Sequence, residues 1–130
     1  MPHIQIDYSA NAAGRVDIAA LCVALRDAAV ATGVLPLAGV RVRAVQVDHW
    51  VIADGDAQHS FIDISVRLRG GRTLEVRKAA VVMIFAAAEA CCARALAETS
   101  LMLSMEMRDI DPELSLKTSS IRRYLPGELA

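Results

Sequence analysis

The feature of this sequence that most constrains its fold is a change of hydrophobic period, from two to 3.6 and back to two, that occurs twice along the chain. Alternating apolar and polar residues are typical of strands, whereas apolar residues three and four positions apart are typical of helices. The strand-like segments are 3–8, 40–47, 61–69 and 101–108, and the helix-like segments are about 17–32 and 73–97. The chain is therefore predicted to contain two successive strand–helix–strand units.

Local signals mark where these elements begin and end. Asp17 is a predicted N-cap of the first helix, which ends at Gly33, because a short polar side chain can accept a hydrogen bond from the first helical turn. Thr73 is the predicted N-cap of the second helix, with Glu75 favourably placed in its first turn. The turn-prone run 53–56 separates the two units.

These elements predict an α+β, two-layer fold. Two β-α-β units would form one four-stranded mixed sheet with both helices on the same face, because right-handed crossovers place each helix consistently. The opposite face of the sheet would be polar. It would carry His3, Gln5, Arg41, Arg43, Asp63, Arg67, Glu106 and Arg108. A solvated face is one interpretation, but 55% hydrophobic residues favour charge pairing across subunits of an oligomer.

Length and charge limit the classes of protein that fit. The 130 residues suit a single domain, 1–130, made of a first unit at about 2–52, a second at about 58–110, and a tail at 111–130. The net charge is −1 with acids and bases interspersed, so neither a nucleic-acid partner nor a membrane surface is expected. The longest apolar run, Ala79–Ala88, is about half a membrane span, and no signal peptide is recognisable.

The cysteines and histidines favour a reducing compartment and no metal. An odd count of three cysteines, with Cys91 and Cys92 adjacent and Cys22 distant, predicts free thiols and a cytoplasmic location. All three are predicted to be buried fillers. The three histidines have no ligand-like spacing and no Cys-x-x-Cys motif exists, so no metal site is expected.

Three residues would form a proton-transfer site if the fold brings them together. Pro2 becomes a terminal secondary amine once Met1 is removed, and such an amine is a general base that needs no side chain. An α-amino group titrates at about 7.7–8.0, and burial beside guanidinium groups favours its neutral form. Arg41 and Arg72 supply planar forks that suit carboxylates. Taken singly, each residue also fits an ordinary exposed position.

Three neighbouring residues are given structural interpretations. Arg43 lies on the same predicted strand face as Arg41 and is assigned to charge pairing. His3 is expected to be a satisfied structural histidine on the polar face. Trp50 is expected to be a core or interface anchor, as a lone tryptophan usually is.

Six short fragments are spread over nearly the whole chain. They are Met1-Pro2-His3, Asp7-Tyr8-Ser9, Pro36-Leu37-Ala38-Gly39-Val40-Arg41-Val42-Arg43-Ala44, Ile52-Ala53-Asp54-Gly55, Gly71-Arg72 and Glu106-Met107-Arg108. Their order and spacing together are specific, and the chain thereby resembles the 5-carboxymethyl-2-hydroxymuconate isomerase family of the tautomerase superfamily.

The resemblance implies a homotrimer of double β-α-β subunits with active sites near subunit boundaries. It implies that Pro2 is the catalytic acid–base group, that Arg41 and Arg72 bind substrate, and that no cofactor takes part. The implied substrate is an unsaturated 2-hydroxy acid of aromatic-compound catabolism with two or more carboxylates, such as 5-carboxymethyl-2-hydroxymuconate. One proton would move from its enol to carbon, giving the 2-oxo isomer.

The chain also departs from the family pattern, and two other functions stay open. Leu35, Ala38, Leu116 and Ser120 differ from the residues that the family favours at those positions, so another unsaturated 2-hydroxy or 2-oxo acid is an alternative substrate. A non-catalytic trimeric binding or scaffold protein with the same fold is one alternative function. A decarboxylase or hydratase using the same proline is the other, although no extra carboxylate beside Pro2 would activate water.

Overall fold

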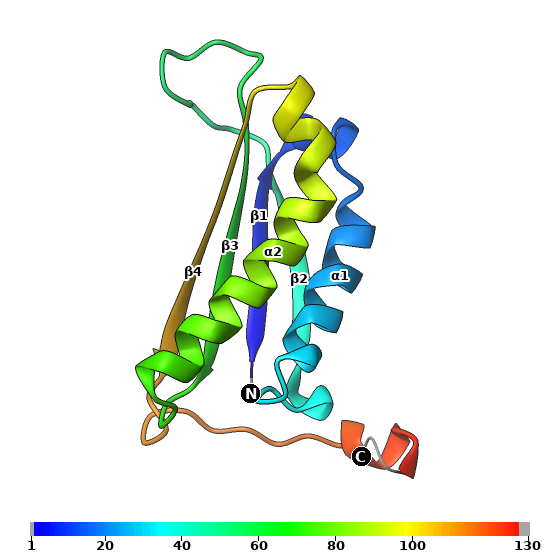
Figure 1. The fold of residues 1–130 in the computed structure, drawn as a ribbon, viewed down its shortest axis with the longest axis vertical. Coiled ribbons are helices and arrows are strands. Elements are labelled where there is room, and N and C mark those ends of the chain that lie inside the picture. The colour runs from blue at the N-terminus through cyan, green and yellow to red at the C-terminus, as the bar shows by residue number, and fades with distance from the viewer. Residues whose placement is uncertain (1, 128–130) are drawn as a thin grey trace.

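The computed structural model describes residues 2–127, and the prediction about Met1 therefore lies outside the described residues. Figure 1 shows four strands and two long helices in the predicted order. They are β1 (His3–Ser9), α1 (Ile18–Ala31), β2 (Arg41–Val47), β3 (Ser60–Arg69), α2 (Leu74–Glu98) and β4 (Leu101–Ile110). Short 3-10 turns occupy Ala10–Gly14, Leu37–Gly39 and Ile121–Tyr124.

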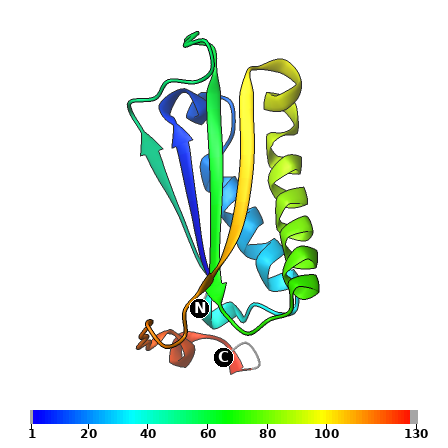
Figure 2. The same ribbon diagram turned by 90° about the vertical axis from the view of Figure 1, so that its left-hand side faces the viewer.

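The four strands form one mixed sheet in the order β2-β1-β3-β4. Within each unit the strands are parallel, with Ile6 beside Ala44 and Ile64 beside Met105. The two units meet through the antiparallel pair β1 and β3, where Ile6 lies beside Ile64. Figures 1 and 2 show both helices on one face of this sheet, so the predicted two-layer α+β fold is confirmed.

The core lies between the sheet and the helices, and strand alternation determines which side chains enter it. Each fully buried large side chain contributes about 1.5–3 kcal/mol of hydrophobic free energy. The core residues on strands and helices include Ile4, Ile6, Leu21, Leu25, Ala29, Ile62, Ile64, Val66, Leu68, Ile84, Ala88 and Cys92. Each strand thereby presents one apolar face to the helices and one polar face to the outside.

Both predicted helix caps are confirmed by their hydrogen bonds. The Asp17 carboxylate accepts from the backbone N–H of Ala20 at 3.0 Å. The Thr73 hydroxyl accepts from the backbone N–H of Val76 at 3.2 Å. Each cap satisfies one of the donors that the first helical turn leaves unpaired, a contribution of about 1 kcal/mol.

The prediction that all three cysteines are buried is wrong for Cys91. Cys92 is buried against the sheet and Cys22 is half-buried, but Cys91 is exposed. Adjacent residues of an α-helix point about 100° apart, because a turn takes 3.6 residues, so only one of the pair can enter the core. Burial, with a smaller effect from Cys91, raises the pKa of Cys92 to about 11.

The outer face of α2 is apolar yet uncovered in the protomer, where Val82 is 69% and Met83 43% exposed. By length and composition, α2 is apolar enough to span a membrane, with a mean hydropathy of 1.8 over its most apolar 18 residues, 28% of which are buried. A core helix of a globular fold passes the same criterion. Here α2 packs on the sheet through Ala80, Ile84 and Ala88.

The tail returns to the end of the sheet where the chain begins. After β4 the Asp111 carboxylate accepts from the Glu113 N–H at 2.9 Å, and its carbonyl accepts from the Ser115 hydroxyl at 2.8 Å. These bonds turn the chain, which then crosses below the sheet toward the start of β2 (Figures 1 and 2). The tail thus places residues 117–121 beside residues about eighty positions earlier.

Candidate active site

The candidate active site lies where β1 and β2 begin. Pro2 is fully buried, and its carbonyl oxygen accepts from the backbone N–H of Arg41 at 3.2 Å. The parallel register then places His3 directly beside Arg41. The structure therefore brings Pro2 and Arg41 together. Because their backbone hydrogen bond continues the pairing of β1 with β2, it holds the start of the chain in a fixed position.

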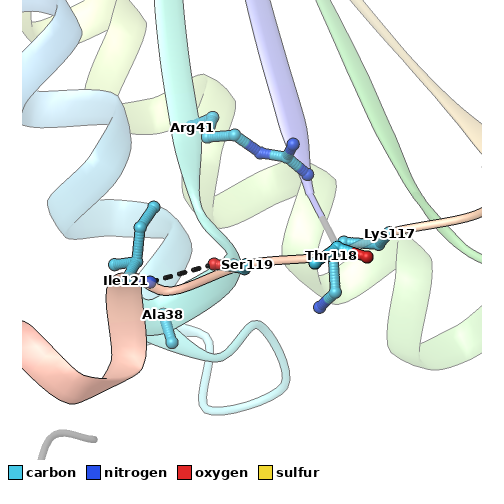
Figure 3. Close-up of a pocket in the computed structure, with 7 residues that line it drawn as sticks. Ala38, Arg41, Lys117, Thr118, Ser119 and Ile121 are labelled. Carbon is cyan, nitrogen blue, oxygen red and sulfur yellow. Dashed lines mark hydrogen bonds between the residues drawn. The ribbon is translucent and has the colours of Figure 1, made fainter.

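A cavity of about 120 Å³ adjoins this strand start. Its walls come from two segments: Ala38, Gly39 and Arg41 at the entry to β2, and Lys117, Thr118, Ser119 and Ile121 on the tail. Figure 3 shows the Arg41 side chain extending from β2 toward the tail. The Ser119 hydroxyl accepts from the backbone N–H of Ile121 at 3.2 Å, which shapes the tail wall.

The site is positively charged. Arg41 and Lys117 both line the cavity, and none of the residues within 2–127 that line it is acidic. Burial lowers the pKa of His3 below its usual 6.5, and the nearby cations Arg41, Arg67 and Arg43 lower it further. Such a cluster of positively charged side chains favours the binding of an anionic ligand.

Arg43 contacts two side chains of the neighbouring strand within the described chain. One guanidinium nitrogen donates to the Gln5 side-chain oxygen at 2.8 Å, and another lies 3.5 Å from Nδ1 of His3. The predicted charge pairing across subunits of an oligomer stays a prediction. The structural interpretation of His3 agrees with its place in this contact.

Arg72 occupies a different place from Arg41. Its guanidinium donates to the carbonyl of Arg69 at 2.8 Å and to the carbonyl of Val34 at 2.8 Å. These bonds join the end of β3 to the connection between α1 and β2, and Arg72 is not among the residues that line the cavity. Its predicted contact with substrate stays a prediction, beside a structural role that the spacing did not indicate.

The tail residues of the site were not identified from the sequence. Lys117, Thr118 and Ser119 lie in a polar stretch without helical or strand periodicity, which carries no signal for where it returns. The sequence offers one signal for a binding role of this stretch, which is that Lys117 is one of only two lysines in the chain. Trp50 is half-buried and belongs to the connection between β2 and β3. Figure 1 shows this connection at the end of the sheet opposite the start of the chain.

Among residues 2–127, no group of three or more His, Cys, Asp or Glu side chains is arranged to hold a metal ion. The polar groups available to a ligand at the cavity are the Arg41 and Lys117 cations and the Thr118 and Ser119 hydroxyls. These groups can bind and orient an anion.

Known proteins resemble this chain over almost its full length. The profile of the 5-carboxymethyl-2-hydroxymuconate isomerase family matches residues 2–125. The 5-carboxymethyl-2-hydroxymuconate Delta-isomerase of Escherichia coli is 31% identical over 121 residues, covering 93% of this chain and 96% of that protein. A crystal structure of a 5-carboxymethyl-2-hydroxymuconate delta-isomerase has a TM-score of 0.88 and 28% identity, covering 98% of this chain and 95% of the other.

A more distant structure shares the fold. A fused 4-OT described as a wild-type symmetric trimer has a TM-score of 0.63 and 23% identity, covering 91% of this chain and 92% of the other. The duplicated β-α-β sheet is thus a fold that this chain shares with the fused 4-OT. The chain itself belongs to the 5-carboxymethyl-2-hydroxymuconate isomerase family, and it is an isomerase.

Proposed function

We propose that this isomerase, once Met1 is removed, uses the amine of Pro2 to move a proton within an unsaturated 2-hydroxy acid such as 5-carboxymethyl-2-hydroxymuconate. The observation that carries the proposal is the hydrogen bond between Pro2 and Arg41 at the edge of a cationic cavity. It places a rigidly held chain start beside a group that binds carboxylates. The proposed location is the cytoplasm.

The proposed reaction balances without any oxidant or reductant. The neutral amine removes the proton from the 2-hydroxyl group, and the C–O bond becomes a carbonyl as the double bonds shift along the conjugated chain. The resulting ammonium then delivers a proton to a distant carbon, forming a C–H bond and regenerating the amine. Arg41 would bind the carboxylate beside the oxygen on which negative charge develops.

Arg72 keeps its proposed part in substrate binding only if its guanidinium can bind substrate while also donating to Val34 and Arg69. A guanidinium has five N–H donors, and these two bonds use two of them. The remaining donors would be available to a carboxylate near the start of α2.

We also propose a homotrimer. The edge strands β2 and β4 each lack a partner strand on one side within the protomer, and the sheet face opposite the helices is polar. Unpaired edges are favourable sites for pairing with another chain. The fused 4-OT of the same fold is a symmetric trimer, which supports this proposal.

The test is an ultraviolet assay of 2-hydroxymuconate ketonisation with protein whose mass shows that Met1 is absent. Pro2→Ala should lower kcat/KM by roughly 10²–10⁴, the usual contribution of a positioned acid–base group. Pro126→Ala, a change at an exposed proline of the tail, is the matched control and should retain activity.

A Met1-free protein that is inactive on this and other enol acids would overturn the proposal in favour of a binding or scaffold protein. Unimpaired turnover by the Pro2→Ala variant would also overturn it, since another group would then move the proton.

A further inference from the structure

We propose that Lys117, on the returning tail, binds the remote carboxylate of the substrate and makes this isomerase selective for dicarboxylates over monocarboxylates. The inference rests on the proposed function, because it concerns the same site. It adds a specificity-determining residue outside the two strand–helix–strand units.

The first argument is the arrangement of charge around the cavity. Its two cationic side chains come from different walls, Arg41 from the start of β2 and Lys117 from the tail. Figure 3 shows Arg41 reaching from its strand toward the segment that carries Lys117. Two cations on facing segments can bind the two ends of one dianion, whereas a monoanion needs only one of them.

The second argument is that Lys117 is available to a ligand. Lys117 is exposed, and none of the salt bridges formed within residues 2–127 involves it. Among residues 2–127, those that line the cavity beside it include no acidic side chain. The adjoining hydroxyls of Thr118 and Ser119 can donate further hydrogen bonds to a carboxylate.

The third argument comes from Arg72, the other predicted carboxylate-binding residue. Its guanidinium bonds to the carbonyls of Val34 and Arg69, and it does not line the cavity that contains Arg41. Among residues 2–127 of one protomer, Lys117 lines this cavity as a second cation beside Arg41. A lysine suits a remote carboxylate because its long stem and single charged group do not demand one fixed geometry.

Local hydrogen bonds shape the tail on both sides of Lys117. Asp111 turns the chain through bonds to Glu113 and Ser115, and the Ser119 hydroxyl accepts from the Ile121 N–H. None of these bonds involves the ammonium group of Lys117. Replacing that group should leave these local turns intact.

The experiment compares two substrates, 2-hydroxymuconate and the monocarboxylate 2-hydroxypenta-2,4-dienoate, with Met1-free protein. Lys117→Gln should lower the ratio of their kcat/KM values, dicarboxylate over monocarboxylate, by roughly tenfold, the effect of one charge-assisted hydrogen bond. The loss should fall mainly on KM for the dicarboxylate. Lys78→Gln, at the other lysine of the chain, exposed on α2, should leave the ratio unchanged.

A second measurement does not depend on turnover. Calorimetric titration measures the binding of hexanedioate, a dianion, and of hexanoate, a monoanion. Lys117→Gln should weaken the binding of hexanedioate by roughly tenfold more than the binding of hexanoate. An unchanged ratio in both experiments would overturn the inference.

If Pro2→Ala abolishes activity while Lys117→Gln keeps the selectivity, this inference fails and the proposed function stands. If the unaltered protein isomerises neither substrate, the proposed function fails and the inference fails with it.

Discussion

At the scale of single residues, Arg41 and Arg72 show that the same side chain can end in very different surroundings. The backbone of Arg41 is fixed by its bond to Pro2, which leaves the guanidinium to face the cavity. The guanidinium of Arg72 is itself the fixed group, with two backbone carbonyls as acceptors. The resemblance to the family implies that both residues bind substrate, but it does not indicate which atoms of each are already hydrogen-bonded.

His3 gives a prediction about acid stability. Burial and the cations Arg41, Arg67 and Arg43 lower its pKa in the folded protein below the unfolded value of 6.5. The unfolded chain therefore binds the proton more readily, so stability is fully present above pH 6.5 and falls as the pH drops toward the folded pKa. We expect the unfolding midpoint to fall less between pH 7.5 and pH 5 in His3→Gln than in the unaltered protein.

The control for this measurement is His49→Gln, on the exposed connection after β2. It should follow the pH dependence of the unaltered protein. Equal acid sensitivity of the His3→Gln and unaltered proteins would show that protonation of His3 does not oppose folding.

At the scale of elements, Arg72 acts as a bridge. Its guanidinium joins the end of β3 to the connection between α1 and β2, two segments that share no backbone hydrogen bond at this point. Arg72→Ala leaves two carbonyls without this donor, so the free energy of unfolding should fall by about 1–2 kcal/mol. Urea unfolding followed by circular dichroism measures this loss.

Arg69→Ala is the matched control, because Arg69 contributes its backbone carbonyl to the bridge and its side chain is exposed. It should change stability by less than Arg72→Ala. Full stability of the Arg72→Ala protein would show that water replaces the guanidinium without cost.

Local chemistry made most elements predictable. Asp17 and Thr73 cap the helices as expected because a cap depends on residues within one turn. The alternation of Ile62, Ile64 and Val66 predicts which face of β3 is buried, since strand geometry has a strict period of two. The exposure of Cys91 was missed because apolar character around α2 exceeds what one sheet face can cover.

The candidate site was predictable only in part. Pro2 and Arg41 begin neighbouring parallel strands, so a β-α-β unit brings them together. The contribution of Lys117 was not predictable, because it depends on where an irregular tail returns rather than on any repeating pattern. The long-range hydrogen bond from Arg72 to the Val34 carbonyl was not predictable either, because both residues lie in irregular segments without a repeating pattern.

At the scale of the whole molecule, one end of the sheet collects three distant parts of the sequence. The chain start, the entry to β2 and the returning tail meet there, while the connection between β2 and β3 lies at the other end (Figure 1). The two strand–helix–strand units supply a rigid base for this end. Family membership and the cationic cavity together favour proton transfer on an anionic substrate at this place.

The most direct test of the central claim compares Met1-free protein with the same chain in which Met1 is retained, each verified by intact mass. Residues 2–130 are then identical in the two proteins, but retained Met1 makes the Pro2 nitrogen an amide, which has no basicity. We expect kcat/KM for 2-hydroxymuconate ketonisation to be at least about 10²-fold lower when Met1 is retained, with an unchanged unfolding midpoint. Equal activity of the two proteins would contradict the claim that the Pro2 amine moves the proton.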